Sequence, residues 1–486
     1  MQATVATTTL TGVEAIAVEV QADVSPGLPV FGIVGLADTA VQEARDRVRA
    51  ALRSVGFDFP NARVIVNLAP APLRKHGTGF DLPIALAVLA ATGQVPRAAL
   101  DDVTAVGELG LDGSVREIPG MLAHAISAAR ADRDLLGPFS AGRMVGVVPQ
   151  LRYRGIESLA RMKGGLPATA SPKASRVQTP AIPILDVADI AGHESAKRGL
   201  EIAAAGRHNL LLVGPPGSGK SMLARALCGL LPPLTEAESL ESALVHSVAG
   251  LDPRQCLDGI RPFRAPHHSC SVAGLVGGGT PPRPGEMSLA HNGVLFLDEL
   301  PEFGPASLQA LRQPIEEGVI TLVRAHGAVR YPARVTLAAA MNPCPCGYAG
   351  DPQRECRCTD GAVARYSARV GGPLYDRMDL TLRIDRVDPA LIIDDAPVTP
   401  MSETVRSRIT TAHAFAGTRH PCSMRSQLQP DARALLEDAA RHANLSGRAV
   451  TRVVRVARTI ADLEQSVPIV VSHVAEALGY RSWDTA

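Results

Sequence analysis

The sequence predicts an α/β fold with three parts: a parallel sheet that carries a phosphate-binding loop, a separate α/β domain before it, and a small helical domain after it. Three observations predict this fold. The apolar run Leu210–Val213 leads directly into a glycine-rich loop, and a second apolar run, Val294–Leu297, ends in two adjacent carboxylates. From residue 402 onward, apolar residues instead recur at the spacing of amphipathic helices.

The composition is that of an ordinary globular protein, with 46% apolar and 20% charged residues. A chain of 486 residues is long for one domain, so two or three are expected. The 49 basic residues nearly cancel the 48 acidic ones, which excludes a protein that is basic over its whole surface and restricts nucleic-acid contact to a local patch. The longest apolar stretch, residues 82–91, is too short to span a bilayer, and the N-terminus has no signal pattern. We therefore expect a cytoplasmic protein without a membrane partner.

Changes in periodicity predict the domain boundaries. We expect an α/β domain over residues 1–165 and a linker over residues 166–184, where Pro, Ser, Ala and Thr occur without periodicity. The core with the phosphate loop then spans residues 185–400, and a helical lid spans residues 401–486. In the lid, Ser446 is expected to cap a helix.

In the first domain, alternating apolar residues predict strands within residues 1–20 and 62–68, and residues 103–115 predict two strands joined by a turn. Residues 39–54 predict an amphipathic helix, and residues 80–91 predict an apolar, buried one. The amphipathic helix is expected to present to solvent Arg45, Arg47, Arg49 and Arg53. These arginines could contact phosphate, but a solvated helix face is the commoner explanation.

The loop after Leu210–Val213 matches the pattern G-x-x-x-x-G-K-[ST]. Its glycines allow backbone N–H groups to hold phosphate oxygens, Lys220 adds a positive charge, and the Ser221 hydroxyl can ligate Mg²⁺. A chance glycine-rich turn is the alternative, but the strand before the loop and the helix after it argue against chance. The sequence therefore predicts ATP and Mg²⁺ as cofactors. The expected nucleotide-binding residues are Gly214, Pro215, Pro216, Gly217, Ser218, Gly219, Lys220, Ser221 and Met222.

Two further strand ends predict hydrolysis of the nucleotide. Asp298 is expected to bind the Mg²⁺ shell, and Glu299 can take a proton from the attacking water. A third apolar strand ends in Asn342, a neutral group that can orient water or contact the γ-phosphate. An ordinary strand-end asparagine is the alternative for Asn342, but its place after the acidic strand favours the catalytic interpretation.

Four cysteines follow Asn342 in a loop rich in Pro and Gly: Cys344, Cys346, Cys356 and Cys358. Four thiolates in the pattern C-x-C-x9-C-x-C favour a structural Zn²⁺, because the loop has few apolar residues to pack by itself. Free thiols or a redox-labile loop are the alternatives. His267 and His268, within residues 261–286, are better explained as polar loop residues than as metal ligands, because no Cys or carboxylate spacing supports a site.

Five longer sequence segments occupy residues 214–221, 263–269, 284–303, 325–333 and 341–347. Their sequences resemble those of the magnesium-chelatase-like AAA+ ATPases and, within them, those of the ComM/YifB competence-protein branch. The resemblance implies a homohexameric ring with active sites shared between neighbouring subunits, acting as a DNA helicase that promotes branch migration. It also implies that Asn342 is the sensor 1 residue. A subunit that remodels a protein partner is the alternative function.

The same resemblance implies two arginine roles. Arg377 matches the arginine finger, which reaches the γ-phosphate of the next subunit, and Arg365 and Arg369 are its competitors. Arg448 matches the sensor 2 arginine at a helix start, with Arg452 as a substitute. The other substitute is Arg455, although a solvent-facing position is a readier explanation for Arg455 and Arg458.

Two segments are expected to contact single-stranded or branched DNA. Residues 322–331 predict a hairpin with a turn at His326, flanked by Arg324 and Arg330, and the family resemblance places such a hairpin in the pore of the ring. The second segment, residues 261–286, is expected to be an insertion between strands. A few arginines on moving loops suit translocation that does not depend on DNA sequence.

The first domain resembles the one that accompanies the Lon protease, through the phrases at residues 75–85 and 107–113. In Lon this fold carries a Ser–Lys dyad. Here Gly79 stands about where the serine would be, and residues 119–123 lack the lysine, so peptide hydrolysis has no nucleophile and base. Thr78 is a disfavoured substitute. We expect a role in assembly or in guiding DNA.

Overall fold

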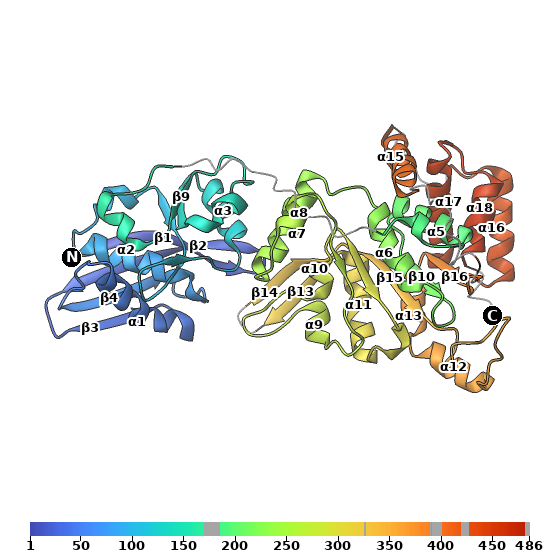
Figure 1. Ribbon diagram of the computed structural model, residues 1–486, viewed down its shortest axis with the longest axis horizontal. Coiled ribbons are helices and arrows are strands. Elements are labelled where there is room, and N and C mark those ends of the chain that lie inside the picture. The colour runs from blue at the N-terminus through green and yellow to red at the C-terminus, as the bar shows by residue number, and fades with distance from the viewer. Residues whose placement is uncertain (170–184, 325–326, 389, 391–400, 419–426, 482–486) are drawn as a thin grey trace.

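The computed structural model describes residues 1–169, 185–324, 327–388, 390, 401–418 and 427–481 (Figure 1). Its N-terminal part is built on a seven-stranded sheet in the order β3-β4-β2-β1-β5-β8-β9. The strands are β1 (Gln2–Thr11), β2 (Glu14–Ser25), β3 (Val30–Val34), β4 (Arg63–Ala69), β5 (Val103–Ala105), β8 (Asp134–Pro138) and β9 (Tyr153–Ile156). The alternating run predicted at residues 1–20 is an antiparallel hairpin of two strands, because Gly12, with φ +66°, turns the chain between them.

Helices α1 (Thr39–Ser54) and α2 (Asp81–Ala91) pack on this sheet, and every residue of α2 is buried. The predicted arginine face of α1 is partly wrong. Arg47 donates from Nε and Nη2 to the buried carboxylate of Asp81, at 2.7 and 2.9 Å, and Arg49 lies over the ring of Phe59. Arg45 and Arg53 are exposed as expected. A buried carboxylate without a charge partner is costly, and this explains why Arg47 turns inward.

A second sheet has five parallel strands in the order β11-β12-β15-β10-β16. The strands are β10 (Leu210–Val213), β11 (Phe263–Arg264), β12 (Val294–Leu297), β15 (Thr336–Met341) and β16 (Leu380–Arg383). All residues of β10, β12 and β15 are buried, as expected for strands covered on both faces. Because β11 belongs to the sheet, the segment at residues 261–286 is partly core, and the prediction of a simple insertion is wrong.

Two apolar clusters cover the faces of this sheet. One includes α5 (Glu194–Gly206), α6 (Lys220–Leu230) and the C-terminal helices, and the other includes α9 (Val272–Val276) and α11 (Pro305–Glu317). The C-terminal helices are α15 (Ser402–Thr418), α16 (Pro430–His442), α17 (Gly447–Leu463) and α18 (Val471–Gly479). They form the red end of the molecule in Figure 1, and the Ser446 side chain caps α17 as predicted.

The solvent-facing position expected for Arg458 is wrong. Its side chain is 3% exposed and donates to Asp462 Oδ1 at 3.1 Å and to the Val467 carbonyl at 2.6 Å. It also donates to the carbonyl of Ser466. Arg458 therefore ties the end of α17 to the chain that follows it. Helical periodicity gave no sign of this role, because the carbonyls of Ser466 and Val467 belong to the turn after the helix.

The two sheets are joined through helix α7 (Glu236–Val248), which packs on α3 (Met121–Arg130) of the N-terminal part. Gly120 donates its N–H to the Ser247 carbonyl at 2.7 Å, and Met121 and Leu122 share an apolar cluster with Ala243. At a second contact, the turn at Gly12 lies against the hairpin of β13 (Val319–Arg324) and β14 (Gly327–Pro332), since a Cβ there would come 2.9 Å from Val329. In Figure 1, α7 (green) and the β13–β14 hairpin (yellow) are the parts that lie toward the N-terminal part.

Candidate nucleotide-binding site

The carboxyl ends of β10, β12 and β15 bring the predicted site residues together. Lys220 Nζ lies 3.2 Å from Asn342 Oδ1, and Ser221 Oγ donates to Asp298 Oδ2 at 2.9 Å. These four side chains come from three segments that are far apart in the sequence. They meet because parallel strands present their carboxyl ends at one edge of the sheet, where ligands bind in open α/β folds.

The phosphate loop has the backbone that its glycines allow. Gly217 and Gly219 have φ of +78° and +85°, and a Cβ at Gly214 would come 2.1 Å from the Ile384 carbonyl, so that position requires glycine. Helix α6 begins at Lys220, and its N-terminus therefore faces the loop and favours an anion there. The Lys220 amine donates to the carbonyls of Gly214 and Pro215 at 2.8 Å each, and burial lowers the pKa of Lys220.

The two acidic residues have different surroundings. Asp298 accepts from Ser221 Oγ with one oxygen and from the Glu299 N–H, at 2.9 Å, with the other. A hydroxyl and a carboxylate placed in this way are ligands that Mg²⁺ prefers. Glu299 has a left-handed backbone, with φ +52°, which is uncommon outside glycine and is typical of functional sites. Its side chain is 59% exposed.

The Glu299 side chain lines a polar cleft of about 570 Å³. The cleft is also lined by Glu302, Asn342, Arg365 and Arg369. His268 approaches Glu299 as well, with Nδ1 3.1 Å from Oε2. The sequence gave no sign of this contact, because His268 and Glu299 are joined only by the packing of the loop after β11 against the end of β12.

The predicted arginine finger is buried in its own chain. Arg377 is 7% exposed, and its guanidinium donates to the carbonyls of Arg312, at 2.9 Å, and Pro373, at 2.5 Å. Its Nη2 also lies 2.8 Å from Glu316 Oε1. The competitor Arg369 lies beside Glu302 at 3.5 Å within the cleft. Arg365 and Arg369 line the same cleft as Glu299 of their own chain, whereas Arg377 is buried outside this lining. The role of Arg377 between subunits stays a prediction.

The sensor 2 candidates of α17 lie in different environments. Arg448 is exposed in the first turn, whereas Arg452 donates to Asp379 Oδ1 at 2.5 Å and to the Arg377 carbonyl at 3.0 Å. Arg455 lies 4.0 Å from the same carboxylate. The structure thus assigns Arg452 a contact within its chain, and a role for Arg448 stays a prediction.

Asn209, which the sequence analysis did not single out, connects three strands of the sheet. Its N–H donates to Asp379 Oδ2 at 2.9 Å, and its amide donates to the Arg377 carbonyl and accepts from the Leu337 N–H at 3.0 Å each. Burial would raise the pKa of Asp379, but the neighbouring His208 and Arg452 outweigh it and leave the pKa at about 2. The ionised Asp379 therefore anchors the Arg377 segment to the start of β10.

The four predicted zinc ligands lie together. Cys344 Sγ is 3.3 Å from Cys346 Sγ and 3.6 Å from Cys356 Sγ, and all four sulfur atoms lie within 4.8 Å of one another. Thiolates bound to one tetrahedral Zn²⁺ at ~2.3 Å lie about 3.8 Å apart, so the donor set fits a Zn²⁺ ion with small adjustments. Cys358 is the fourth member of this cluster.

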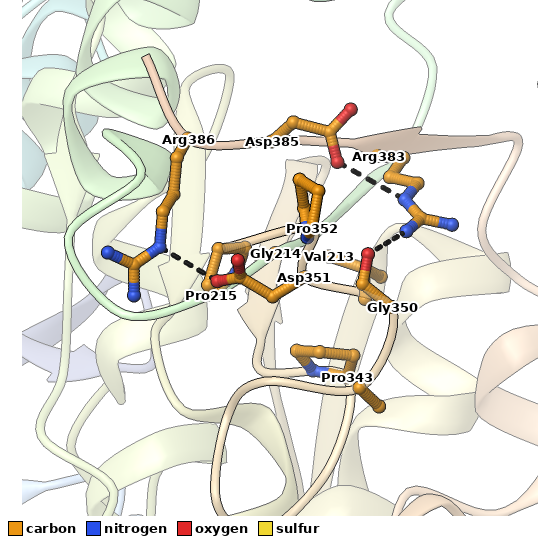
Figure 2. A pocket seen from close by; sticks show the side chains of 11 residues that line it. Val213, Gly214, Pro215, Pro343, Gly350, Asp351, Pro352, Arg383, Asp385 and Arg386 are labelled. Carbon is orange, nitrogen blue, oxygen red and sulfur yellow. Dashed lines mark hydrogen bonds and ion pairs between the residues drawn. The ribbon is translucent and has the colours of Figure 1, made fainter. Parts of the chain in front are cut away.

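The cysteine loop packs directly on the nucleotide site. A Cβ at Gly347 would come 2.6 Å from Pro216 of the phosphate loop. Figure 2 shows the next part of the loop, where Arg386 donates to Asp351 at 2.7 Å and Arg383 to the Gly350 carbonyl at 2.9 Å beside Gly214 and Pro215. A change in the conformation of the cysteine loop is therefore expected to alter the conformation of the phosphate loop.

The predicted DNA hairpin exists as strands β13 and β14. Arg324 and Arg330 are both exposed, but the register pairs Arg324 with Gly327 and Arg330 with Thr321, which places the two arginines on opposite faces. His326 lies outside the described residues. Arg261 of the second predicted DNA segment is 6% exposed and bonded to the Asn292 carbonyl at 2.5 Å, so it is a structural arginine.

The Lon-like site offers no Ser–Lys pair among the residues described. Thr78 Oγ1 donates to Glu108, and the nearest lysine in sequence, Lys75, is fully buried with its amine bonded to the Pro70 carbonyl. Burial lowers the pKa of Lys75.

Models of the magnesium chelatase ChlI subunit match the chain over residues 20–140, residues 186–392 and, with the C-terminal part of that subunit, residues 399–481. YifB of Salmonella typhimurium is 43% identical over 489 residues, which cover 97% of this chain and 96% of that protein. The chain belongs to the magnesium-chelatase-like AAA+ family, in its ComM/YifB branch. The competence protein ComM of Haemophilus influenzae is 41% identical over the same shares of both chains.

Membership of the magnesium-chelatase-like family confirms the predicted resemblance and fold class. A putative Lon protease homologue of Methanothermobacter thermautotrophicus is 47% identical over 58 residues, 12% of this chain and 11% of that protein, which supports the Lon-like element of the predicted fold class. The family supports ATP and Mg²⁺ as cofactors. Within the described residues, no helix is long and apolar enough to cross a bilayer.

Proposed function

We propose that this chain is an ATP-hydrolysing ring motor, a homohexameric helicase that translocates on DNA and promotes branch migration during recombination and natural transformation. One observation carries the proposal: Lys220, Ser221, Asp298 and Asn342 converge at one sheet edge, with Glu299 beside them. This set supplies a phosphate cradle, an Mg²⁺ site and a candidate base for water. The relative named a competence protein, at 41% identity, supports the proposed role in natural transformation.

Within this site each side chain would have a separate task. Lys220 neutralises phosphate charge, Ser221 and Asp298 would bind the Mg²⁺, which draws charge from the phosphate oxygens when bound, and Asn342 orients water or the γ-phosphate. Glu299 accepts the proton of the attacking water. Arg377 of a neighbouring subunit would stabilise charge that develops in the transition state, so that hydrolysis depends on ring assembly.

The exposed hairpin is the proposed contact to DNA. Arg324 and Arg330 lie on the two faces of a two-stranded ribbon that projects beside the N-terminal sheet (Figure 1). Arginines on such a ribbon can contact phosphates on either side without reading sequence. We also propose that the four-cysteine cluster binds Zn²⁺, whose part is to fix the loop that packs on Pro216.

The test is ATP turnover and the unwinding of branched DNA by the purified full chain. Branched or single-stranded DNA is expected to accelerate turnover, and Arg324→Ala and Arg330→Ala are each expected to reduce that acceleration. Arg441→Ala is the matched control, because Arg441 is an exposed arginine of α16, remote in the fold from the hairpin. ATP turnover that DNA does not accelerate would contradict the motor function. It would favour the alternative, a subunit that remodels a protein partner, which the match to the chelatase models also supports.

A further inference from the structure

The hairpin of β13 and β14 has one packed face and one open face. Ile320 and Tyr331, which pair across the two strands, are buried on the packed face. Leu322 and Val329 pair next along the hairpin, and because side chains alternate along a strand they continue the same face, half-buried. Arg330 is exposed on the opposite face. The contacts of the packed face therefore determine where the Arg330 side chain points.

The turn between β1 and β2 of the N-terminal part supplies one of these contacts. Gly12 is buried in this turn, and a Cβ on it would come 2.9 Å from Val329 Cγ1 and 3.0 Å from the Arg330 carbonyl oxygen. Its φ of +66° and the lack of a side chain allow the backbone itself to approach the hairpin. The contact with Val329 lies on the face opposite to the Arg330 side chain. Figure 1 shows β14 on the side of the core that faces the N-terminal part.

The turn is held in place by its own strands and by helix α7. All ten residues of β1 pair with β2, up to the turn itself. Just before the turn, the Leu10 side chain packs on Gly120, where a Cβ would come 2.6 Å from Leu10 Cδ1. The Gly120 N–H donates to the Ser247 carbonyl of α7 at 2.7 Å. The turn at Gly12 is therefore connected to the core through two short contacts.

Helix α7 also holds the end of the hairpin. Arg334, which follows β14, forms an ion pair with Glu241 of α7, and its N–H donates to His291 Nδ1 at 3.0 Å. Because Nδ1 of His291 accepts, Nε2 carries the proton and donates to Glu241 Oε2 at 3.2 Å. One helix thus carries both the turn, through Ser247, and the end of the hairpin, so the two are held in a fixed relation to each other.

We propose that Gly12 is a positioning residue for the contact to DNA: the turn between β1 and β2 braces the hairpin from the face opposite to Arg330 and holds this arginine ready for phosphate. The inference rests on the proposed function, because it takes the hairpin as the contact to DNA. An isolated two-stranded hairpin is only marginally stable, and a hairpin that is ordered before binding loses less conformational entropy on DNA. The brace gives the Lon-like part a role in guiding DNA.

The experiment measures ATP turnover of the full chain against the concentration of a single-stranded oligonucleotide. Gly12→Asn keeps the left-handed turn, which asparagine tolerates, but places its Cβ against Val329. The oligonucleotide concentration for half-maximal acceleration is expected to rise about 2- to 12-fold, the cost of one side chain that must be ordered on binding. Gly93→Asn is the matched control and is expected to leave this concentration unchanged. Gly93 has φ +75°, and among the described residues nothing beyond its chain neighbours lies within 4 Å of a Cβ there.

A second variant tests whether the effect passes through the contact. Val329→Ala leaves the turn unaltered and is expected to raise the half-maximal concentration less than Gly12→Asn does. In the double variant the missing methyl groups make room for the new Cβ, so the concentration is expected to return toward the wild-type value. Two unrelated defects would add instead, because only residues in contact show such coupling. A double variant no better than Gly12→Asn would overturn the brace, as would wild-type behaviour of Gly12→Asn alone.

Hydrogen exchange of the protein without DNA tests the brace independently of the motor function. Residues 327–332 are expected to exchange faster in Gly12→Asn than in the wild type or in Gly93→Asn, because the hairpin loses a support. Equal exchange rates would overturn the proposal. If Gly12→Asn does not fold, Val329→Ala provides the same comparison with the turn intact. If the ATP turnover of the wild type does not respond to DNA, the motor function fails, and the exchange rates still decide whether the turn supports the hairpin.

Discussion

Arg377 Nη2 lies 2.8 Å from Glu316 Oε1 of the same chain. Its Nε donates to the Arg312 carbonyl and its Nη1 to the Pro373 carbonyl, so the arginine is held at the end of its segment with little freedom. A preorganised arginine costs little conformational entropy when it meets a phosphate. A role at a subunit interface would require the exchange of the Glu316 carboxylate for the triphosphate of the neighbour.

Removal of Arg377 is expected to abolish ATP turnover, because this arginine would act on the ATP of the neighbouring subunit. Arg377→Ala is expected to lower kcat by about 10³-fold or more, the loss typical of an arginine finger, with ATP binding retained. Because each active site would take its base from one chain and its arginine from the next, mixing Arg377→Ala with the hydrolysis-deficient Glu299→Gln is expected to restore part of the activity. Mixed rings that remain fully inactive would contradict a shared site.

Substitutions in the phosphate loop and at the end of the acidic strand are expected to impair different steps, ATP binding and ATP hydrolysis. Glu299→Gln keeps the size of the side chain but cannot accept a proton, so ATP should still bind while hydrolysis falls by about 10²-fold or more. Lys220→Ala removes the charge within the loop and is expected to weaken ATP binding itself. Equilibrium binding of a fluorescent ATP analogue and turnover, measured on both variants, separate the two effects. A Glu299→Gln protein with normal turnover would exclude this residue as the base.

The cysteine cluster is expected to contain Zn²⁺ in the purified protein. Elemental analysis should find about one zinc per chain, in line with a four-thiolate structural site, and Cys356→Ser should lose it. Cys270→Ser is the matched control, because Cys270 is a free thiol outside the cluster. Since Gly347 packs on Pro216, loss of the metal is also expected to weaken ATP binding. A metal-free protein with four reactive thiols and normal ATP affinity would contradict a structural zinc.

Acid is expected to destabilise the N-terminal part through His124. Burial lowers the pKa of His124 to about 4, and its Nδ1 lies 2.6 Å from Thr8 Oγ1. The unfolded chain takes up a proton near pH ~6.5 whereas the folded chain does so only near pH 4, so stability is full above pH ~6.5 and is lost as the pH falls toward 4. The expected slope is about 1.4 kcal/mol per pH unit from this histidine.

Denaturant titrations between pH 7 and pH 5 measure this slope. His124→Gln is expected to unfold more easily at pH 7 but to lose less stability on acidification than the wild type. His442→Gln, at an exposed histidine of α16, provides the reference, because its side chain is 78% exposed. Equal slopes for His124→Gln and the wild type would show that His124 does not cause the acid sensitivity.

Sequence patterns alone determined the fold class, the phosphate loop and the residues at the strand ends. An apolar run followed by G-x-x-x-x-G-K-S fixes local backbone and chemistry together, so Lys220 and Ser221 could be named without a structure. The cysteine cluster could be anticipated for the same reason, since spacing within one loop brings the ligands close. The hairpin of β13 and β14 was likewise encoded by neighbouring residues.

Only the tertiary structure decided which distant side chains share an environment. Periodicity treats Arg47 and Arg458 as members of helix faces, but Asp81 and Gln427, to which they donate, come from other parts of the chain. The contact of His268 with Glu299 and the link through Asn209 arise in the same way. A carboxylate or guanidinium takes its orientation from whichever charge or carbonyl the packing brings within about 3 Å, and no local pattern records that neighbour.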